Sequence, residues 1–89
     1  MNVTVRLYGA ARVALRCRER ALELAEGATV ADLVRECVAQ LGPRAAEYLV
    51  DARGRGYGVA FVVNERAATA DTQLSAGDVV ALMPPTAGG

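Results

Sequence analysis

Alternating apolar and polar residues near the start of the chain predict two β-strands. Within residues 3–8, every second residue from Val3 to Leu7 is apolar, and the residues between them are polar or aromatic. Residues 20–24 alternate in the same way, with two leucines on one face. Such alternation is typical of a strand with one buried face. We expect the two strands to pair antiparallel through a loose loop over residues 10–17, which leaves room for a helical turn.

A helix is the clearest element in the pattern. Its apolar residues recur at spacings of three and four and form one stripe: Val30, Leu33, Val34, Cys37, Val38 and Leu41. Thr29 is a good N-cap, and Asp32 three residues later imitates a capping box. Gly42-Pro43 ends the helix. Because Cys37 lies in the apolar stripe, we expect it to be a buried structural thiol rather than a reactive one.

Two apolar runs in the second half, residues 59–63 and 79–83, predict two further strands with apolar residues on both faces. The turn between residues 74 and 78 is expected to be tight, with Gly77 at positive φ. The weaker segments are expected to form a short helical segment at 44–49, a glycine-rich turn at 51–58, a turn at 64–65 and a short edge strand within 66–73.

The resulting order, β-β-α-β-β, indicates an α+β fold in which one helix covers one face of a small mixed sheet. A sheet face open to water should alternate with polar residues, yet both late strands are apolar on both faces. We therefore predict an apolar patch on the face away from the helix, and a partner protein that binds it through residues including Tyr8 and Phe61. The alternative is that the loops at residues 10–18 and 44–57 fold over this face.

The last six residues predict an arm that extends from a domain formed by residues 1–83. They are Pro84, Pro85, Thr86, Ala87, Gly88 and Gly89. A proline cannot continue a strand ladder, and a second proline keeps the next residues extended. Six extended residues reach about 20 Å. A terminal glycine carboxylate has no side chain to obstruct it, so the tip can enter a narrow channel and react there; the alternative is a frayed, inert end.

Composition limits the chemistry that the chain can perform. Its 89 residues suffice for one domain, and its ten basic and ten acidic residues cancel, which argues against nucleic-acid or membrane-surface binding. The local basic stretch between Arg12 and Arg20 is interpreted as a solvated face. There is no histidine, so neither a zinc site nor a nucleophilic triad is expected. With no long apolar run and two separate cysteines, Cys17 and Cys37, we expect a cytoplasmic protein with free thiols.

At three places the residues resemble a known family. The predicted order of elements is similar to the ubiquitin-like β-grasp. Residues 74–80, Leu-Ser-Ala-Gly-Asp-Val-Val, are similar to the L-x-x-G-D-x-V run of bacterial sulfur carriers, and Val63-Asn64-Glu65 resembles their V-N-G/E turn. Residues 83–89 resemble the tail of the MoaD/ThiS-like sulfur carrier family, and the Pro-Pro pair favours its MoaD branch. The stretch 44–58 looks longer than in the shortest members, which leaves the pathway open.

The resemblance implies a mechanism that uses the C-terminus. An E1-like adenylyltransferase of the MoeB/ThiF type would use ATP and magnesium to convert Gly89 to an acyl-adenylate, and a persulfide donor would leave a Gly89 thiocarboxylate. The arm would then enter a MoaE-like large subunit of molybdopterin synthase and deliver sulfur to cyclic pyranopterin monophosphate. Gly88 and Gly89 would carry the chemistry, and residues 84–87 would position it. The carrier itself would bind no cofactor or metal.

Two other interpretations stay open at this point. The chain would be a sulfur carrier for another pathway, such as cysteine, thiamin or tRNA thiolation, or a ubiquitin-like modifier joined through Gly89 to lysines. Alternatively, it would be a plain ubiquitin-like interaction domain whose terminus has no chemical role.

Overall fold

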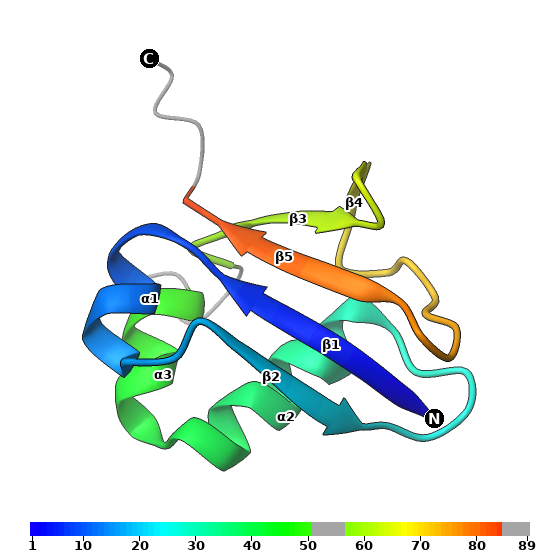
Figure 1. The fold of residues 1–89 in the computed structure, drawn as a ribbon, viewed down its shortest axis with the longest axis horizontal. Coiled ribbons are helices and arrows are strands. Elements are labelled where there is room, and N and C mark those ends of the chain that lie inside the picture. The colour runs from blue at the N-terminus through cyan, green and yellow to red at the C-terminus, as the bar shows by residue number, and fades with distance from the viewer. Residues whose placement is uncertain (51–56, 85–89) are drawn as a thin grey trace.

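The computed structural model describes residues 1–50 and 57–84, and this part of the chain holds five strands and three helices (Figure 1). In chain order they are β1 (Asn2–Leu7), α1 (Gly9–Leu15), β2 (Glu19–Glu23), α2 (Val30–Leu41), α3 (Pro43–Leu49), β3 (Ala60–Val63), β4 (Arg66–Ala68) and β5 (Val79–Met83). Within these ranges, no helix is long and apolar enough to cross a membrane.

The strands form one mixed sheet in the order β2-β1-β5-β3-β4. β1 pairs antiparallel with β2, with Val3 opposite Leu22, which confirms the first predicted pair. β1 and β5 are parallel neighbours at the centre, with Val5 opposite Val80. β3 joins the other edge of β5 and forms an antiparallel hairpin with β4. The ubiquitin-like β-grasp architecture predicted for the chain is thus confirmed.

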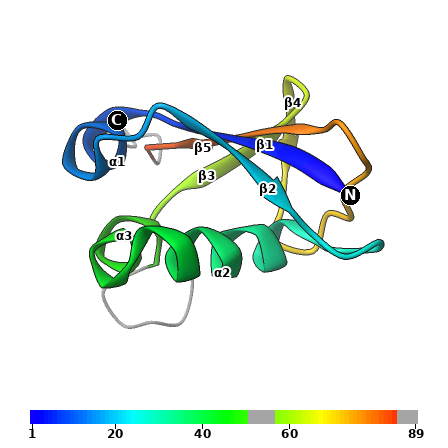
Figure 2. The same ribbon diagram turned by 60° about the horizontal axis from the view of Figure 1, so that its bottom comes forward.

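Helix α2 begins and ends at the residues that the apolar stripe predicts. The hydroxyl of Thr29 accepts a hydrogen bond from the Asp32 amide at 3.3 Å, and the Thr29 amide donates to the Asp32 carboxylate at 2.9 Å, so the capping box is closed in both directions. Figure 2 shows α2 and α3 together on one face of the sheet. On the side of α2 that faces the sheet, Leu33 and Cys37 are fully buried.

The expectation of a single true helix is wrong, because residues 9–15 form α1 and residues 43–49 form α3. The short helical segment expected at 44–49 is therefore present, and it begins one residue earlier with Pro43, a residue favoured in the first turn. α1 contains three alanines, which favour helix, but at seven residues it is too short to show a clear period. It ends at Arg16, whose φ of 52° places it in the left-handed region.

Neither additional helix covers the second face of the sheet. α3 lies with α2, and α1 lies at one end of the sheet, where it contacts α3 (Figure 2). The alternative was that the loops at residues 10–18 and 44–57 cover this face. Part of the second loop, residues 51–56, lies outside the described residues. Among the described residues, the face opposite α2 is open. We call it the open face, and the face packed against α2 and α3 the covered face.

The residues that resemble sulfur-carrier motifs hold the turns together. Asn64 and Glu65 have φ values of 49° and 71°, as a two-residue hairpin turn of type I′ requires. The Asn64 side chain accepts a hydrogen bond from the Val79 amide at 2.9 Å and donates one to the Asp78 carboxylate at 2.8 Å. Gly77 has the predicted positive φ, 86°. These motifs therefore fix the start of β5 against the β3–β4 hairpin.

Candidate functional site

The base of the predicted arm lies at the end of the central strand β5. Pro84 follows Met83 and is exposed. Pro85, Thr86, Ala87, Gly88 and Gly89 lie outside the described residues, so their predicted roles stay predictions. Because β5 is flanked by β1 and β3, Pro84 lies at the middle of one end of the sheet.

A glycine lies directly against the base of the arm. Gly9 has a φ of 62°, which glycine adopts without strain. A Cβ at this position would lie 2.7 Å from Cγ of Pro84, well inside van der Waals contact. The alternating pattern of residues 3–8 gives no signal for this contact. The contact shows that Pro84, the first residue of the arm, packs on the β1–α1 turn, and that a side chain at position 9 would require Pro84 to move.

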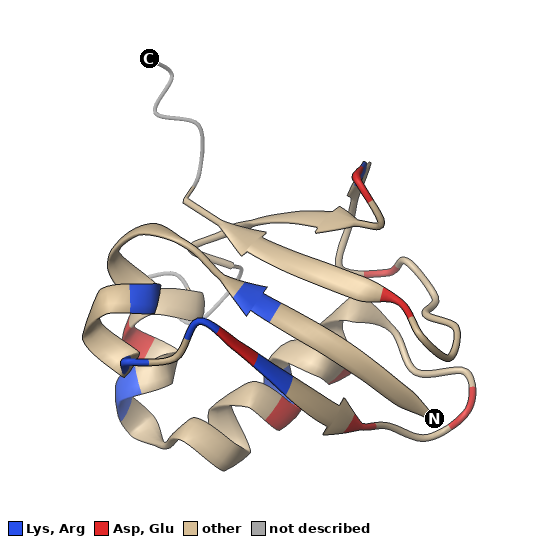
Figure 3. Ribbon diagram, in the orientation of Figure 1, with Lys and Arg blue, Asp and Glu red and all other residues tan. Residues whose placement is uncertain are grey.

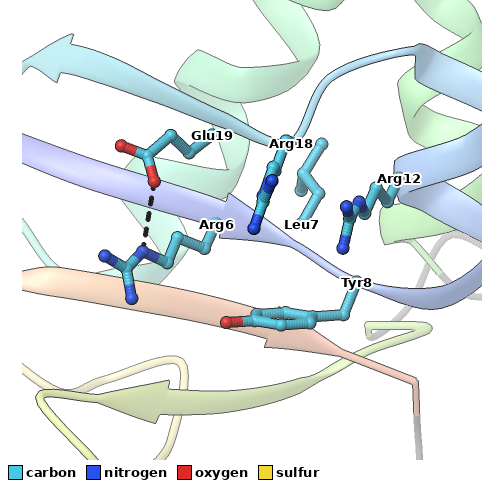
Figure 4. A pocket seen from close by; sticks show the side chains of 6 residues that line it. All are labelled: Arg6, Leu7, Tyr8, Arg12, Arg18 and Glu19. Carbon is cyan, nitrogen blue, oxygen red and sulfur yellow. Dashed lines mark hydrogen bonds and ion pairs between the residues drawn. The ribbon is translucent and has the colours of Figure 1, made fainter.

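The open face is apolar along β3 and β5, as predicted. The sheet register places Val62 of β3 opposite Ala81 of β5, and Ala60 opposite Met83, all four on the open face. Val62, Ala81 and Met83 are partly exposed, and Ala60 is exposed. Tyr8 continues the open-face side of β1 beyond its end and is half-buried, with its ring drawn across the end of β5 in Figure 4. Tyr8 thus lies at the end of the open face, and its role in partner binding stays a prediction.

The placement of Phe61 on the open face is wrong. Phe61 is 8% exposed, lies opposite Leu82 in the register and belongs to the core on the covered face. Its ring meets that of Tyr57 edge to face, with centroids 5.1 Å apart. Because residues 59–63 are apolar without interruption, the sequence does not show which alternate residues face the helix, and the largest of them fills the core.

A second feature of this end of the sheet was not predicted as a site. A cleft of about 250 Å³ opens where β1, α1 and the start of β2 meet (Figure 4). We call it the arginine cleft; its lining residues are Arg6, Leu7, Tyr8, Arg12, Arg18 and Glu19. Arg6 pairs with Glu19 through Nε at 3.3 Å. Among the described residues, neither Arg12 nor Arg18 forms an ion pair with a carboxylate.

Local backbone geometry brings the arginines together. The amides of Arg16 and Cys17 donate to the carbonyls of Val13 and Arg12, each at 3.3 Å, which turns the chain back at the end of α1. The Leu7 amide then donates to the Arg18 carbonyl at 2.9 Å. The basic stretch was visible in the sequence, but Arg6 comes from another strand. In the sequence, Arg6 could have been linked to the basic stretch through its place in the alternating pattern of β1, which puts it on the open face.

In the described parts of the body, one of the two thiols is buried and no cluster of metal ligands forms. Burial raises the pKa of the Cys37 thiol to about 12, so it stays protonated and unreactive at neutral pH, as expected of a structural thiol. Cys17 is partly buried beside the Glu19 carbonyl. Within residues 1–50 and 57–84, no three His, Cys, Asp or Glu side chains gather as a metal site would require. The features that remain are surfaces: the open face, the arginine cleft and the base of the arm.

These features define a class: a ubiquitin-like β-grasp domain with a glycine-terminated tail beyond its central strand. The model of the ThiS family matches residues 5–89, nearly the whole chain and including the two terminal glycines. The chain therefore belongs to the ThiS family and is a MoaD/ThiS-like sulfur carrier. A comparison with the curated proteins finds no match.

Solved structures agree with this assignment. The putative molybdopterin converting factor subunit 1 of Pyrococcus furiosus is 30% identical, with a TM-score of 0.78, over 97% of this chain and 99% of that one. The small archaeal modifier protein 1 of Haloferax volcanii is 23% identical with a TM-score of 0.85, over 96% and 98% of the chains. In the complex of subunits 1 and 2 of the molybdopterin-converting factor of Helicobacter pylori, the matching chain is 22% identical with a TM-score of 0.60, and both chains are fully covered. The last two likenesses establish the fold alone.

Proposed function

We propose that this protein is the sulfur-donor subunit of a molybdopterin synthase, and that it carries sulfur as a thiocarboxylate on Gly89. The observation that carries the proposal is the family match, which extends to Gly89 itself. The described body supports it in a second way: it presents an exposed arm base and an open apolar face. A carrier needs these handles, because the acids and bases of its reactions belong to the enzymes that it visits.

The proposed chemistry begins with a poor electrophile, the Gly89 carboxylate. An E1-like adenylyltransferase with ATP and magnesium forms the acyl-adenylate and releases pyrophosphate. The terminal sulfur of an enzyme persulfide attacks the acyl carbon and expels AMP, which gives an acyl disulfide. A second thiol attacks the enzyme cysteine sulfur of that acyl disulfide, so that a disulfide forms between the two thiols and the acyl-bound sulfur is released as the Gly89 thiocarboxylate. The thiocarboxylate then serves as the nucleophile that transfers sulfur to cyclic pyranopterin monophosphate.

The large synthase subunit is the proposed partner for the open face. The Helicobacter pylori complex, in which subunit 1 is bound to subunit 2, motivates this choice. Val62 and Met83 are partly exposed on the open face of β3 and β5, so Val62→Ser and Met83→Ser should leave the fold intact. We expect each to weaken binding of the large subunit by about tenfold, measured by isothermal titration calorimetry. If both variants bind as the parent does, the open face is not the interface.

An intact-mass experiment tests the carrier chemistry. Incubation with an E1-like adenylyltransferase, ATP, magnesium and a persulfide donor should add about 16 Da, the difference between sulfur and oxygen. Deleting Gly89 should abolish the increase, and so should extending the chain beyond it. Gly88→Val should impair it, because a branched side chain obstructs a narrow activating channel. Thermal unfolding of each variant is the control and should match the parent. A truncated chain that still gains sulfur would overturn the proposal.

A second candidate is a ubiquitin-like modifier or a carrier for another pathway. The printed description of the Haloferax volcanii relative as a modifier protein motivates the first of these. The activated Gly89 would then form isopeptide bonds with lysines. Reconstitution with the large synthase subunit and cyclic pyranopterin monophosphate separates the candidates: molybdopterin formation supports the synthase subunit, and Gly89 conjugates in its place support the modifier.

A further inference from the structure

We propose that the arginine cleft binds a carboxylate-bearing segment of the enzyme that receives the arm. The inference rests on the proposed carrier function and deepens it by naming a docking site on the body and the chemistry of its ligand. Its starting observation is a local charge imbalance. The chain as a whole has no net charge, yet the cleft gathers Arg6, Arg12 and Arg18 around a single carboxylate, Glu19.

The charges are not required by the fold in the parts described. Arg6 and Glu19 are about half exposed, and their pair at 3.3 Å is a surface contact of small energetic value. Arg12 and Arg18 are exposed and have no carboxylate partner among the described residues. Figure 4 shows both guanidinium groups directed into the space beside Tyr8. Three guanidinium groups gathered around one carboxylate keep an excess of positive charge and repel one another, so an incoming carboxylate relieves this repulsion as well as forming new contacts.

The cleft lies where an enzyme that holds the arm must also approach. Tyr8 lines the cleft, and its neighbour Gly9 contacts Pro84 at the base of the arm. Arg6 and Tyr8 also belong to the open-face side of β1, so the cleft continues the open face toward α1. Figure 3 shows this arrangement: basic residues gather at the α1 end, and β3 and β5 beside them carry no charge. One partner surface can therefore cover apolar β5 and place an acidic segment in the cleft.

The cleft suits a carboxylate through the donors that line it. It opens to solvent and has a volume of about 250 Å³, so an acidic side chain of a partner can enter it. Arginine is the side chain best suited to bidentate binding of a planar carboxylate. Glu19 can be displaced from Arg6 by an incoming acid, because the pair that it forms is long and exposed.

A nucleic acid fits these observations less well. Phosphate backbones are bound by extended basic tracks, whereas this basic region ends at Glu19 and Glu23 on β2. The zero net charge removes the long-range attraction that such binding uses. We therefore assign the cleft to protein carboxylates and treat nucleic acid and free phosphate as outcomes of the test.

The first experiment is an NMR titration of the full chain, which does not depend on sulfur transfer. The probe is tetraglutamate blocked at both ends, and tetraglutamine is its neutral control. We expect shifts at the amides of Leu7, Tyr8, Arg12 and Arg18 with the acidic peptide alone. The double variant Arg12→Gln and Arg18→Gln should weaken binding by about tenfold. The matched control, Arg44→Gln with Arg66→Gln, makes the same change of net charge outside the cleft and should bind as the parent does.

The second experiment measures how well the protein docks to the E1-like adenylyltransferase, using the rate of Gly89 activation as the readout. Because the proposed role of the cleft is to bind the enzyme and not to act on Gly89, the cleft variant should raise KM for the carrier by about tenfold with kcat within twofold. The effect should shrink as salt is raised, since partly exposed charge pairs are screened.

Several results would overturn the inference. They are an absence of peptide-induced shifts at the cleft, equally tight binding of inorganic phosphate or of a single-stranded oligonucleotide, and an unchanged KM of the cleft variant with the adenylyltransferase. Failure of the carrier function gives a different result. In that case the parent gains no sulfur with any donor, while the peptide titration still decides whether the cleft binds carboxylates.

Discussion

The covered and open faces of the same sheet differ in how fully the chain itself buries their apolar side chains. On the covered face, Val5, Leu7 and Leu82 are completely buried beneath α2 and α3. On the open face, Ala81 and Met83 stay partly exposed, and no described element covers them. Leu82 lies between Ala81 and Met83 on the same strand, β5. Position in the sheet is therefore the same for these three residues, and only the cover differs.

This difference separates folding from recognition. Complete burial of a valine or leucine contributes roughly 1.5–3 kcal/mol, so the covered face supplies most of the free energy of folding. Side chains on the open face gain only part of that amount in the free protein, and a partner that covers them supplies the rest. The arginine cleft and the base of the arm lie together at the α1 end of the sheet, beside the open face. Substitutions on the covered face should therefore affect stability, and substitutions on the open face should affect binding.

The largest expected effect comes from adjacent residues of β3 that point to opposite faces. Phe61→Ala should lower the free energy of unfolding by about 3–5 kcal/mol, because it leaves a cavity in the core. Val62→Ala, on the open face, should cost about 1 kcal/mol or less. Urea unfolding followed by circular dichroism measures both, and Phe61→Leu provides a folded intermediate case if Phe61→Ala does not fold. Equal losses for Phe61→Ala and Val62→Ala would show that the open face is part of the folding core.

The sequence predicted the elements of the covered face well, because helix and strand periods are physical consequences of one-sided burial. The stripe from Val30 to Leu41 defined α2 to the residue, and alternation defined β1 and β2. Where both sides of a strand are apolar, the period carries no information about orientation. That is why Phe61 was placed on the wrong face. Helix α1 was missed for a similar reason: seven residues span only two turns.

The candidate site was less predictable, because it combines residues from separate parts of the chain. The arm was predicted from its composition alone, and it stays a prediction because only Pro84 of it lies within the described residues. The arginine cleft needs Arg6 from β1 and Arg18 from the segment before β2, and their proximity depends on the left-handed turn at Arg16. The role of Gly9 depends on a contact with Pro84, far away in sequence. No local pattern encodes either contact.

The next largest effect tests the base of the arm against a matched glycine. Gly9→Ala and Gly77→Ala both place alanine at a φ of 62° or 86°, which should cost about 1–2 kcal/mol in each case. Only at Gly9 would the new methyl group meet another residue, Pro84. We therefore expect Gly9→Ala to lower the rate of Gly89 activation and Gly77→Ala to leave it unchanged in the folded protein. Equal activation rates for both would show that the contact does not direct the arm.

A smaller effect concerns the N-terminal cap of α2. The cap stabilises the helix at its first turn, separately from the apolar residues that pack on the covered face. Thr29→Ala removes the hydroxyl that accepts a hydrogen bond from the Asp32 amide, and it should cost about 1 kcal/mol. Thr29→Ser keeps the hydroxyl and is the control, with a loss well below that of alanine. Urea unfolding measures both variants, and binding to the large synthase subunit should be unchanged because Thr29 does not belong to the open face. An equal loss for serine and alanine would show that the cap contributes nothing.

The smallest expected effect is the pH dependence of this same cap. The hydrogen bond from the Thr29 amide, and then the Arg35 guanidinium at 2.8 Å, hold the pKa of Asp32 below its ordinary value of 3.8. Since the folded state binds the proton less readily than the unfolded chain, the contribution of Asp32 is complete above the unfolded pKa. It is lost as the pH falls through the folded pKa. The partly exposed carboxylate is screened by water, so the effect is small. Asp32→Asn removes this titration and should therefore lose less stability than the parent between pH 6 and about 2.5, a range that brackets the ordinary pKa of the carboxyl. Urea midpoints at the two pH values make the comparison, and an equal loss in both proteins would show that the acid sensitivity of the covered face arises from other carboxylates.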